Sequence, residues 1–194
     1  MDIQDIEPAS IAFDIDGVVA DTMTLFLAIA DQNFGISGLR YEDITEYDLQ
    51  KCLGIDEILM WEIIVRILGG NYAMPLNPIA DAPAVLKRIN QRHQPTLFVT
   101  ARPDAEHISE WLCKMLDVPE AAVEVIATGS FEDKREILMD RGVGYFVEDR
   151  LETCFLIADA GIRPIVFKQP WNRKPHPFPE VGTWRELESM IRLK

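Results

Sequence analysis

The chain has 194 residues, of which 48% are hydrophobic, and its formal net charge is −13. This length fits one domain, or a core with a small insertion, and the apolar content excludes a disordered chain. The negative charge argues against a nucleic-acid polymer or an anionic membrane as the main partner, because such surfaces bind basic faces. The sequence shows no signal-peptide pattern and no run of about 18 apolar residues, so we expect a soluble, cytoplasmic protein.

Short apolar runs bounded by polar, glycine or proline residues predict the strands of a buried sheet. Five such runs occur, at residues 11–13, 96–100, 123–127, 144–147 and 164–167. Helical patterns lie between them, and in one of these the apolar residues follow the spacing of a single buried face: Ile108, Trp111, Leu112, Met115 and Leu116. This alternation predicts an α/β fold with a mainly parallel sheet, in which ligands collect at the carboxyl ends of the strands.

Residues 21–80 interrupt the alternation, because they show helical patterns and no convincing strand. Helices are predicted at 22–34 and 56–68, since each pattern ends at a glycine, and 41–53 is predicted to be helical as well. A helical insertion directly after the first strand would lie over the carboxyl end of that strand, as a lid does. We therefore expect a core domain of residues 1–20 and 81–194 and a helical cap domain of residues 21–80.

The strongest chemical signal is the pair Asp14 and Asp16, which stands with Gly17 at the end of the first predicted strand. Two carboxylates at i and i+2 beside a buried strand repel each other and lose hydration. A metal ion or a reaction usually accounts for such a pair. An aspartate-rich turn that closes the strand is the alternative.

Three further polar features follow the later predicted strands. Thr100 and Ala101 stand before a predicted helix, an arrangement that suits oxyanion binding, although an ordinary helix N-cap region is the alternative. Lys134 follows the third strand, where a solvated helical lysine is the common alternative. Glu148 and Asp149 follow the fourth strand, where a surface turn is the alternative.

Taken in order, these features resemble the four motifs of the haloacid dehalogenase superfamily. The resemblance covers about residues 9–20 and 81–167 and rests on four segments: Phe13-Asp14-Ile15-Asp16-Gly17-Val18-Val19-Ala20-Asp21-Thr22, Val99-Thr100, Lys134 and Glu148-Asp149. It implies the fold of that superfamily, a Rossmann-like parallel sheet core with a small helical cap inserted after the first strand.

Within that superfamily the chain resembles the 5'(3')-deoxyribonucleotidases and their bacterial nucleotidase relatives, on sequence features that are less specific than the four motifs. The signs are Asp43-Ile44-Thr45 and Tyr47-Asp48-Leu49 in the insertion, Thr100-Ala101-Arg102-Pro103 followed by Glu110-Trp111-Leu112, and Pro170-Trp171-Asn172-Arg173. The chain departs from the pattern at Thr22, where the characterised mammalian nucleotidases carry an aromatic residue.

The resemblance implies a phosphatase that works through an aspartyl-phosphate. Asp14 would attack phosphorus, and Asp16 would act first as general acid and then as general base. Relatives that attack carbon lack an acid at the second position, so Asp16 favours a phosphatase over a dehalogenase. Thr100, Ala101 and Lys134 would bind the phosphoryl oxygens.

Mg²⁺ is the cofactor that the resemblance implies. A carboxylate oxygen of Asp14, the backbone carbonyl of Asp16 and the carboxylate of Asp149 would bind it. Glu148 would act from the outer shell of the metal or through a water molecule. In many relatives both of the last two positions are aspartate, so the longer Glu148 leaves the division of metal contacts between 148 and 149 open.

The expected substrate is a small phosphorylated molecule, with nucleoside 5'-monophosphates as the first class to test and sugar phosphates or other phosphometabolites as the alternative. The candidates to contact the substrate are Trp61, Arg102, Asn172 and Arg173. Trp61 could instead pack within the cap, and the two arginines could simply be solvated. A non-catalytic binding or regulatory protein on the same fold is the alternative of another class. The oligomeric state stays open, with a homodimer among the options.

Overall fold

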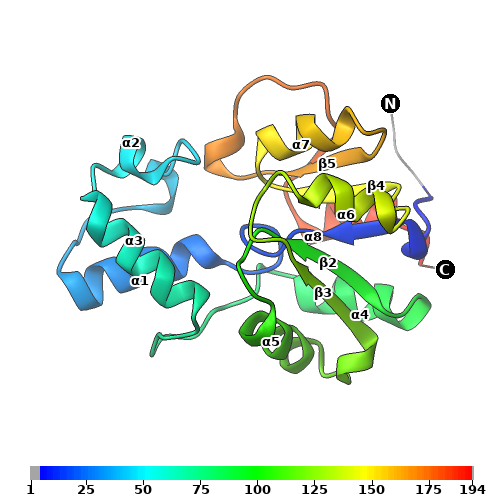
Figure 1. Cartoon of the computed structure of the whole chain (residues 1–194), viewed down its shortest axis with the longest axis horizontal. Coiled ribbons are helices and arrows are strands. Elements are labelled where there is room, and N and C mark those ends of the chain that lie inside the picture. Colours follow the sequence, from blue (N-terminus) through cyan, green and yellow to red (C-terminus); the bar gives the residue numbers. More distant parts are fainter. Residues whose placement is uncertain (1–4, 194) are drawn as a thin grey trace.

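The computed structural model describes residues 5–193, and its centre is a parallel sheet of six strands in the order β3-β2-β1-β4-β5-β6 (Figure 1). Every neighbouring pair of strands in this sheet is parallel. The strands are β1 Ile11–Phe13, β2 Thr96–Thr100, β3 Val123–Ala127, β4 Tyr145–Glu148, β5 Arg163–Phe167 and β6 Glu180–Val181. The predicted α/β fold with a parallel sheet is therefore confirmed.

Helices outside residues 21–80 cover both faces of the sheet. They are α4 Ala82–Arg92, α5 Glu106–Leu116, α6 Lys134–Asp140, α7 Leu151–Ala158 and α8 Trp184–Met190, with the short 3₁₀ helices η1 Pro8–Ser10, η3 Glu120–Ala122 and η4 Pro170–Asn172. Helix α4 contacts α5 and α8, whereas α6 contacts α7, so the helices form two layers. Among the described residues no helix is long and apolar enough to cross a membrane.

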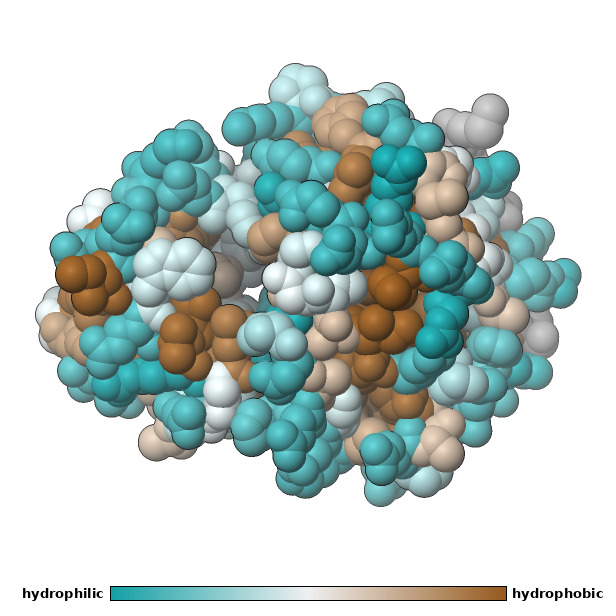
Figure 2. Space-filling view, viewed as in Figure 1, coloured by the Kyte–Doolittle hydropathy of each residue, from teal (hydrophilic) through white to brown (hydrophobic). Residues whose placement is uncertain are grey.

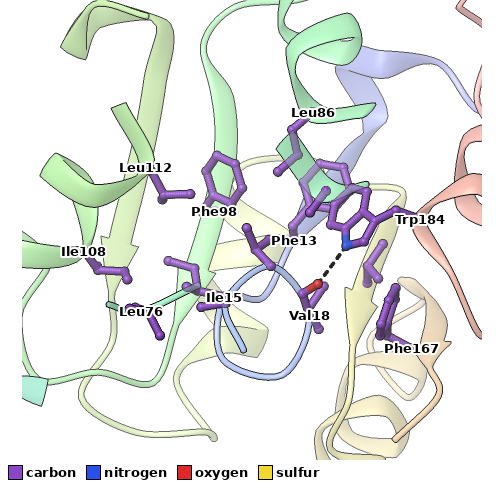
Figure 3. Close-up of a cluster of buried hydrophobic side chains, with 14 of the residues drawn as sticks. Phe13, Ile15, Val18, Leu76, Leu86, Phe98, Ile108, Leu112, Phe167 and Trp184 are labelled. Carbon is purple, nitrogen blue, oxygen red and sulfur yellow. Dashed lines mark hydrogen bonds between the residues drawn. The ribbon is translucent and has the colours of Figure 1, made fainter. Parts of the chain in front are cut away.

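The larger core lies on the sheet face that α4, α5 and α8 cover (Figure 3). The ring of Phe13 lies 5.8 Å from that of Phe98 and 5.5 Å from that of Trp184, measured between centroids. The indole N–H of Trp184 donates a hydrogen bond of 2.8 Å to the carbonyl of Val18, in the loop after β1. This core therefore fixes the loop in which Asp16 stands.

A second, smaller core lies on the opposite face of the sheet, beneath α6 and α7. Its buried residues are Ala12, Val99, Leu138, Phe146, Ile157 and Ile162. Phe13 and Ala12 are neighbours in β1 but belong to different cores, because successive side chains of a strand point to opposite faces. Burial on both faces explains why the strands read as continuous apolar runs in the sequence.

Residues 21–80 lie to one side of the sheet and contribute α1 Thr22–Phe34, η2 Tyr41–Asp43, α2 Leu49–Leu53 and α3 Glu57–Leu68 (Figure 1). Helix α1 has the predicted bounds, and its end is set by Gly35, which adopts the left-handed conformation. An isolated bridge between Ala20 and Pro78 brings the two ends of this segment together. The division of the chain into a core and a cap domain at these ends stays a prediction.

Residues 41–53 differ from the single helix that the sequence pattern predicts. They form the short 3₁₀ helix η2 and, after a non-helical stretch, the five-residue helix α2. The side chain of Asp48 accepts a hydrogen bond from the N–H of Gln50 and so caps the start of α2. A cap at this position favours a new helix start over a continuous helix.

Candidate active site

Three buried acids converge at the carboxyl ends of β1 and β4, where the strand order of the sheet reverses. Phe13 pairs with Val147 across these two strands, so the next residues, Asp14 and Glu148, lie side by side. Asp149 follows, and one carboxylate oxygen from each acid lies within 4.8 Å of the others. Such a reversal is where ligands bind in open α/β sheets.

Lys134, the first residue of α6, is the cation of this cluster. Its Nζ donates hydrogen bonds of 2.8 Å to Oδ1 of Asp14 and 2.9 Å to Oε2 of Glu148. The side chain is only 1% exposed, and its Nζ lies 5.9 Å from the ring centroid of Phe131 and 5.6 Å from that of Phe146. Lys134 is thus a buried ion-pair partner of the acids and not a solvated lysine.

The charges in this cluster do not balance. Burial and the neighbouring Glu148 raise the pKa of Asp14 to about 8, although Lys134 acts in the opposite direction. Burial, Glu148 and Asp14 also raise the pKa of Asp149 well above its usual value. Burial opposes the charge of Lys134, but Asp14 and Glu148 outweigh it and raise the pKa of the lysine, so its ammonium group stays protonated. A further cation beside Asp14 and Asp149 would relieve this excess of negative charge.

Asp149 has one carboxylate oxygen in use and one free. Its Oδ2 accepts a hydrogen bond of 2.9 Å from the indole N–H of Trp171. Its Oδ1 is buried and has no hydrogen-bond partner in the part of the chain that the structure describes. A buried carboxylate oxygen without a partner costs stability, and oxygen donors of this kind are the ligands that Mg²⁺ takes in proteins. The residues present therefore fit a hard divalent cation.

Glu148 is held differently from Asp149. Its Oε1 accepts the backbone N–H groups of Asp149 and Arg150, both at 3.0 Å, while Oε2 accepts Lys134. Both oxygens are thus used within the chain. This arrangement suits a residue that orients Lys134 and the loop after β4.

Gly17 allows the loop after β1 to lie close to Asp149. It adopts a φ of +78°, and a Cβ atom built there would lie 2.2 Å from Oδ2 of Asp149 and 3.1 Å from the ring of Trp171. Any larger residue would therefore push the Asp149 carboxylate out of place.

Asp16 lies close to Asp14 but is bound to other partners. Arg102 donates to it from Nε at 2.9 Å and from Nη2 at 2.7 Å, and the hydroxyl of Thr22 donates at 2.5 Å. Burial would raise the pKa of Asp16, but the charge and hydrogen bonds of Arg102, with the bond from Thr22, hold it below its usual value. The sequence pointed to Asp16 and, as a substrate contact, to Arg102, but it gave no sign that the two side chains are paired.

Thr100 and Ala101 lie at the end of β2, on the other side of β1 from Glu148 and Asp149. The Thr100 side chain is buried, and its Oγ1 accepts the N–H of Arg102 at 3.3 Å, which leaves the hydroxyl proton free to donate to a ligand. Helix α5 begins only at Glu106, so a loop separates Thr100 and Ala101 from the helix start.

Two other sequence candidates, Asn172 and Arg173, build the loop behind Asp149. The amide of Asn172 donates to the carbonyls of Asp149 and Phe167, both at 2.8 Å. Arg173 in turn donates to Oδ1 of Asn172 at 2.6 Å. The remaining candidate, Trp61, lies on α3 and is 53% exposed.

An aromatic contact between residues 41–53 and the core stands beside the acids, and the sequence motifs did not indicate it. The guanidinium of Arg150 lies 4.3 Å from the ring centroid of Phe131 and 5.3 Å from that of Tyr47, and the two rings meet edge to face at 5.6 Å. A pocket of about 280 Å³ adjoins this contact and is lined by Glu46, Tyr47, Asp48, Lys51, Arg150, Leu151, Glu152, Trp171 and Lys174. Figure 2 shows a hollow between the α1–α3 segment and the core on the face turned to the viewer.

Comparison with known proteins identifies relatives over nearly the whole chain. A family model described as "5' nucleotidase, deoxy (Pyrimidine), cytosolic type C protein" matches residues 8–194. A protein of Halalkalibacterium halodurans named "Putative nucleotidase BH1399" is 30% identical over 186 residues, which are 92% of this chain and 90% of the relative. "Putative nucleotidase YqfW" of Bacillus subtilis is 26% identical over 166 residues, 85% of this chain and 83% of the relative.

Solved structures with the same fold are hydrolases of the haloacid dehalogenase type. A haloacid dehalogenase-like hydrolase of Streptococcus pneumoniae, SP0104, superposes with a TM-score of 0.60 at 11% identity and covers 91% of this chain and 95% of its own. A protein of Haemophilus somnus 129PT described as a "predicted phosphoglycolate phosphatase" superposes with a TM-score of 0.61 at 13% identity. It covers 96% of this chain and 97% of its own. These likenesses confirm the fold, and the family model and the 30% identical relative confirm the closer resemblance. The chain therefore belongs to the 5'-nucleotidase family that this model describes, a group of phosphatases with the haloacid dehalogenase fold.

Proposed function

We propose that this chain is a Mg²⁺-dependent phosphomonoesterase that acts on nucleoside 5'-monophosphates through an aspartyl-phosphate. The observation that carries the proposal is the cluster of Asp14, Glu148 and Asp149, with Lys134 bound to Asp14 and one oxygen of Asp149 left without a partner among residues 5–193. The family membership and the names of the two relatives support the substrate class. A cytoplasmic location is part of the same proposal.

Three groups at the end of the sheet would hold Mg²⁺. They are the carboxylates of Asp14 and Asp149 and the backbone carbonyl of Asp16, while Glu148 would orient Lys134. When bound, the cation would neutralise negative charge on the phosphoryl group and on the nucleophile. The free Oδ1 of Asp149 and the fully used carboxylate of Glu148 favour this division of roles.

In the first half of the reaction, a carboxylate oxygen of Asp14 attacks the phosphorus, and the bond from phosphorus to the ester oxygen breaks. Asp16, which the negative phosphoryl group of the bound substrate keeps protonated against the opposing effect of Arg102 and Thr22, gives its proton to that oxygen, so the nucleoside leaves as a neutral alcohol. The ammonium of Lys134, the hydroxyl of Thr100 and the backbone N–H of Ala101 hold the phosphoryl oxygens, on which negative charge builds up.

In the second half, Asp16 has become a carboxylate and takes a proton from a water molecule. The water oxygen attacks the phosphorus, the bond to Asp14 breaks, and inorganic phosphate leaves. Arg102 and Thr22 favour the ionised form of Asp16, which this half-reaction requires. The enzyme returns to its starting state with the proton again on Asp16.

The pocket of about 280 Å³ beside Arg150 and Trp171 is the proposed place for the leaving group, since it adjoins Asp149 and contains two aromatic side chains, Tyr47 and Trp171. Small phosphometabolites such as sugar phosphates are the second candidate class. One observation favours them: Thr22, which stands where the mammalian nucleotidases have an aromatic residue, turns its hydroxyl to Asp16 and offers no ring to a base.

A panel of phosphorylated metabolites, assayed for phosphate release with Mg²⁺, tests the proposal. We expect the highest kcat/KM for nucleoside 5'-monophosphates, no turnover without the metal and none in Asp14→Asn. A preference for sugar phosphates would favour the second class. Absence of Mg²⁺-dependent turnover on every phosphoester would instead favour a non-catalytic protein.

A further inference from the structure

Arg102 directs its guanidinium at Asp16 from a fixed position in the core. Its side chain is only 3% exposed, whereas that of Asp16 is 27% exposed. Its backbone is tied down on both sides, because its N–H donates to Oγ1 of Thr100 and its carbonyl accepts the N–H of Gly129 at 3.0 Å. The guanidinium therefore has little freedom to turn toward a ligand.

Both oxygens of the Asp16 carboxylate are engaged by fixed donors. Nε of Arg102 donates to Oδ2, Nη2 donates to Oδ1, and the hydroxyl of Thr22 also donates to Oδ1. Two parallel hydrogen bonds from one guanidinium fix the plane of a carboxylate as well as its place, which the single ammonium of a lysine does not do. The orientation of Asp16 is thus set by residues 86 and 6 positions away in the chain.

We propose that Arg102 is a positioning residue for proton transfer and not a ligand of the substrate. It holds the Asp16 carboxyl group at the orientation from which the proton reaches the ester oxygen of the leaving group. The inference rests on the proposed phosphatase function and deepens it. In this step Arg102 touches neither the phosphate nor the leaving group, and it acts only by orienting Asp16.

This role has a signature in the choice of leaving group. A nucleoside leaves as an alkoxide, a strong base that needs a proton when the P–O bond breaks. The p-nitrophenolate ion is a weak base and leaves without one. Loss of the Asp16 orientation therefore slows phosphoryl transfer from a nucleotide far more than transfer from p-nitrophenyl phosphate. A residue that bound the phosphate would affect both substrates alike.

The test compares Arg102→Ala with the wild type on the preferred nucleotide and on p-nitrophenyl phosphate, both with Mg²⁺. Leaving-group release in a single turnover is measured, because Asp16 also serves the second half of the reaction, which is the same for both substrates. For the nucleotide we expect this rate to fall about 30- to 100-fold, with the half-saturating substrate concentration changed less than about threefold. For p-nitrophenyl phosphate we expect it to fall less than about threefold. A rise in the half-saturating concentration at an unchanged rate, or an equal loss on both substrates, would overturn the inference.

A second comparison places the same change in an Asp16→Asn background. Because Arg102 acts only through Asp16, adding Arg102→Ala there should change the remaining nucleotide turnover less than about twofold. A further loss of tenfold would show that Arg102 contacts the substrate. A wild type inactive on every phosphoester would refute the proposed function, whereas the two variant comparisons refute only the role of Arg102.

Two milder variants cover the case in which Arg102→Ala fails to fold. Arg102→Lys keeps the positive charge but loses the paired hydrogen bonds, and Thr22→Val removes only the third donor to Asp16. Both should lower the single-turnover rate of leaving-group release more for the nucleotide than for p-nitrophenyl phosphate, with the lysine variant the more affected of the two. Equal effects on the two substrates in both variants would overturn the inference.

Discussion

The carboxyl end of the sheet buries charged side chains, whereas helix α3 in residues 21–80 exposes apolar ones. At the sheet, five charged residues are buried: Asp14, Arg102, Lys134, Glu148 and Asp149. On α3, three apolar residues are exposed to 79%, 53% and 62%: Ile58, Trp61 and Val65. Brown atoms over α3 in Figure 2 mark the aliphatic part of this surface.

The difference shows where this protein tolerates change. Buried charges are stable only as a set, because removing one leaves its partners uncompensated in a medium of low polarity. The opposite face of α3 packs its own apolar residues, Met60, Ile63 and Ile67, so the exposed face contributes little to the fold. Substitutions at the end of the sheet should therefore affect reaction and stability together, whereas those on the exposed face of α3 should affect at most the choice of substrate.

The largest effect is expected at Asp14. Asp14→Asn keeps the size of the side chain but removes the proposed nucleophile, so kcat for phosphate release should fall on the order of 10⁴-fold or more. Initial rates with Mg²⁺ and a nucleoside 5'-monophosphate measure this. A variant that kept more than about one hundredth of the activity would contradict the assignment of the nucleophile.

Lys134→Ala should reduce both activity and stability. Loss of one preorganised donor to the phosphoryl group costs about 2 to 4 kcal/mol in the transition state, which is about 30- to 1000-fold in kcat. Breaking a buried ion pair costs about 3 to 5 kcal/mol of unfolding free energy, because Asp14 and Glu148 lose their cation.

Lys114→Ala is the matched control for Lys134→Ala, since that lysine is 80% exposed and pairs with Glu110 on the surface. Urea unfolding and steady-state rates of both variants make the comparison. A Lys134→Ala protein as stable as the control would show that the buried acids do not depend on the lysine.

The excess of negative charge predicts how metal affinity depends on pH. Burial and Glu148 raise the pKa of Asp14 to about 8, so without metal this carboxyl group is mostly protonated at pH 6 and 7. A metal ligand must lose its proton, so Asp14 alone should make the affinity for Mg²⁺ rise by up to about tenfold per pH unit below pH 8, and this contribution should level off above pH 8. Calorimetric titrations from pH 6 to 9 measure this. An affinity independent of pH would contradict the raised pKa.

Gly17→Ala should disturb the site with little change in the rest of the fold. The added Cβ would overlap the Asp149 carboxylate, so we expect kcat to fall about tenfold and Mg²⁺ affinity to weaken as the carboxylate moves. Gly54→Ala is the control, because Gly54 has a similar φ of +63° but no atom within 4 Å of the added Cβ. Both variants should lose about 1 kcal/mol of stability through backbone strain. Equal activity in the two would show that the contact between Gly17 and Asp149 is unimportant.

The sequence predicted those parts of the site that local patterns encode. Asp14, Glu148 and Asp149 stand directly after apolar runs, and Lys134 follows the loop after another run; parallel strands bring such positions to one edge of the sheet. The acids could therefore be grouped without a structure. For the same reason the bounds of β2 and β3 were predicted in full.

The parts that the sequence did not predict depend on contacts between distant residues or on very short elements. Asp16 and Arg102 are 86 positions apart, and no periodicity connects them. Strand β6 has two residues, too few to show a pattern. The break between η2 and α2 depends on a side-chain cap at Asp48, which competes with the apolar spacing that favoured one helix over 41–53.

The smallest effect is expected at Trp61, on the exposed face of α3. Trp61→Ala should change the unfolding free energy by less than about 0.5 kcal/mol, because the side chain is 53% exposed. If its ring stacks on the base, KM for a nucleotide should rise about two- to tenfold while KM for p-nitrophenyl phosphate stays constant, since that substrate has no base.

Ile58→Ala is the control for Trp61→Ala, because Ile58 is also exposed on α3 but carries no ring. An equal KM for the nucleotide in both variants would remove Trp61 from the substrate site. The contrast between the two regions would then be sharper, since the exposed face of α3 would serve neither stability nor recognition. Substrate choice would in that case rest with Tyr47 and Trp171, which line the pocket beside Asp149.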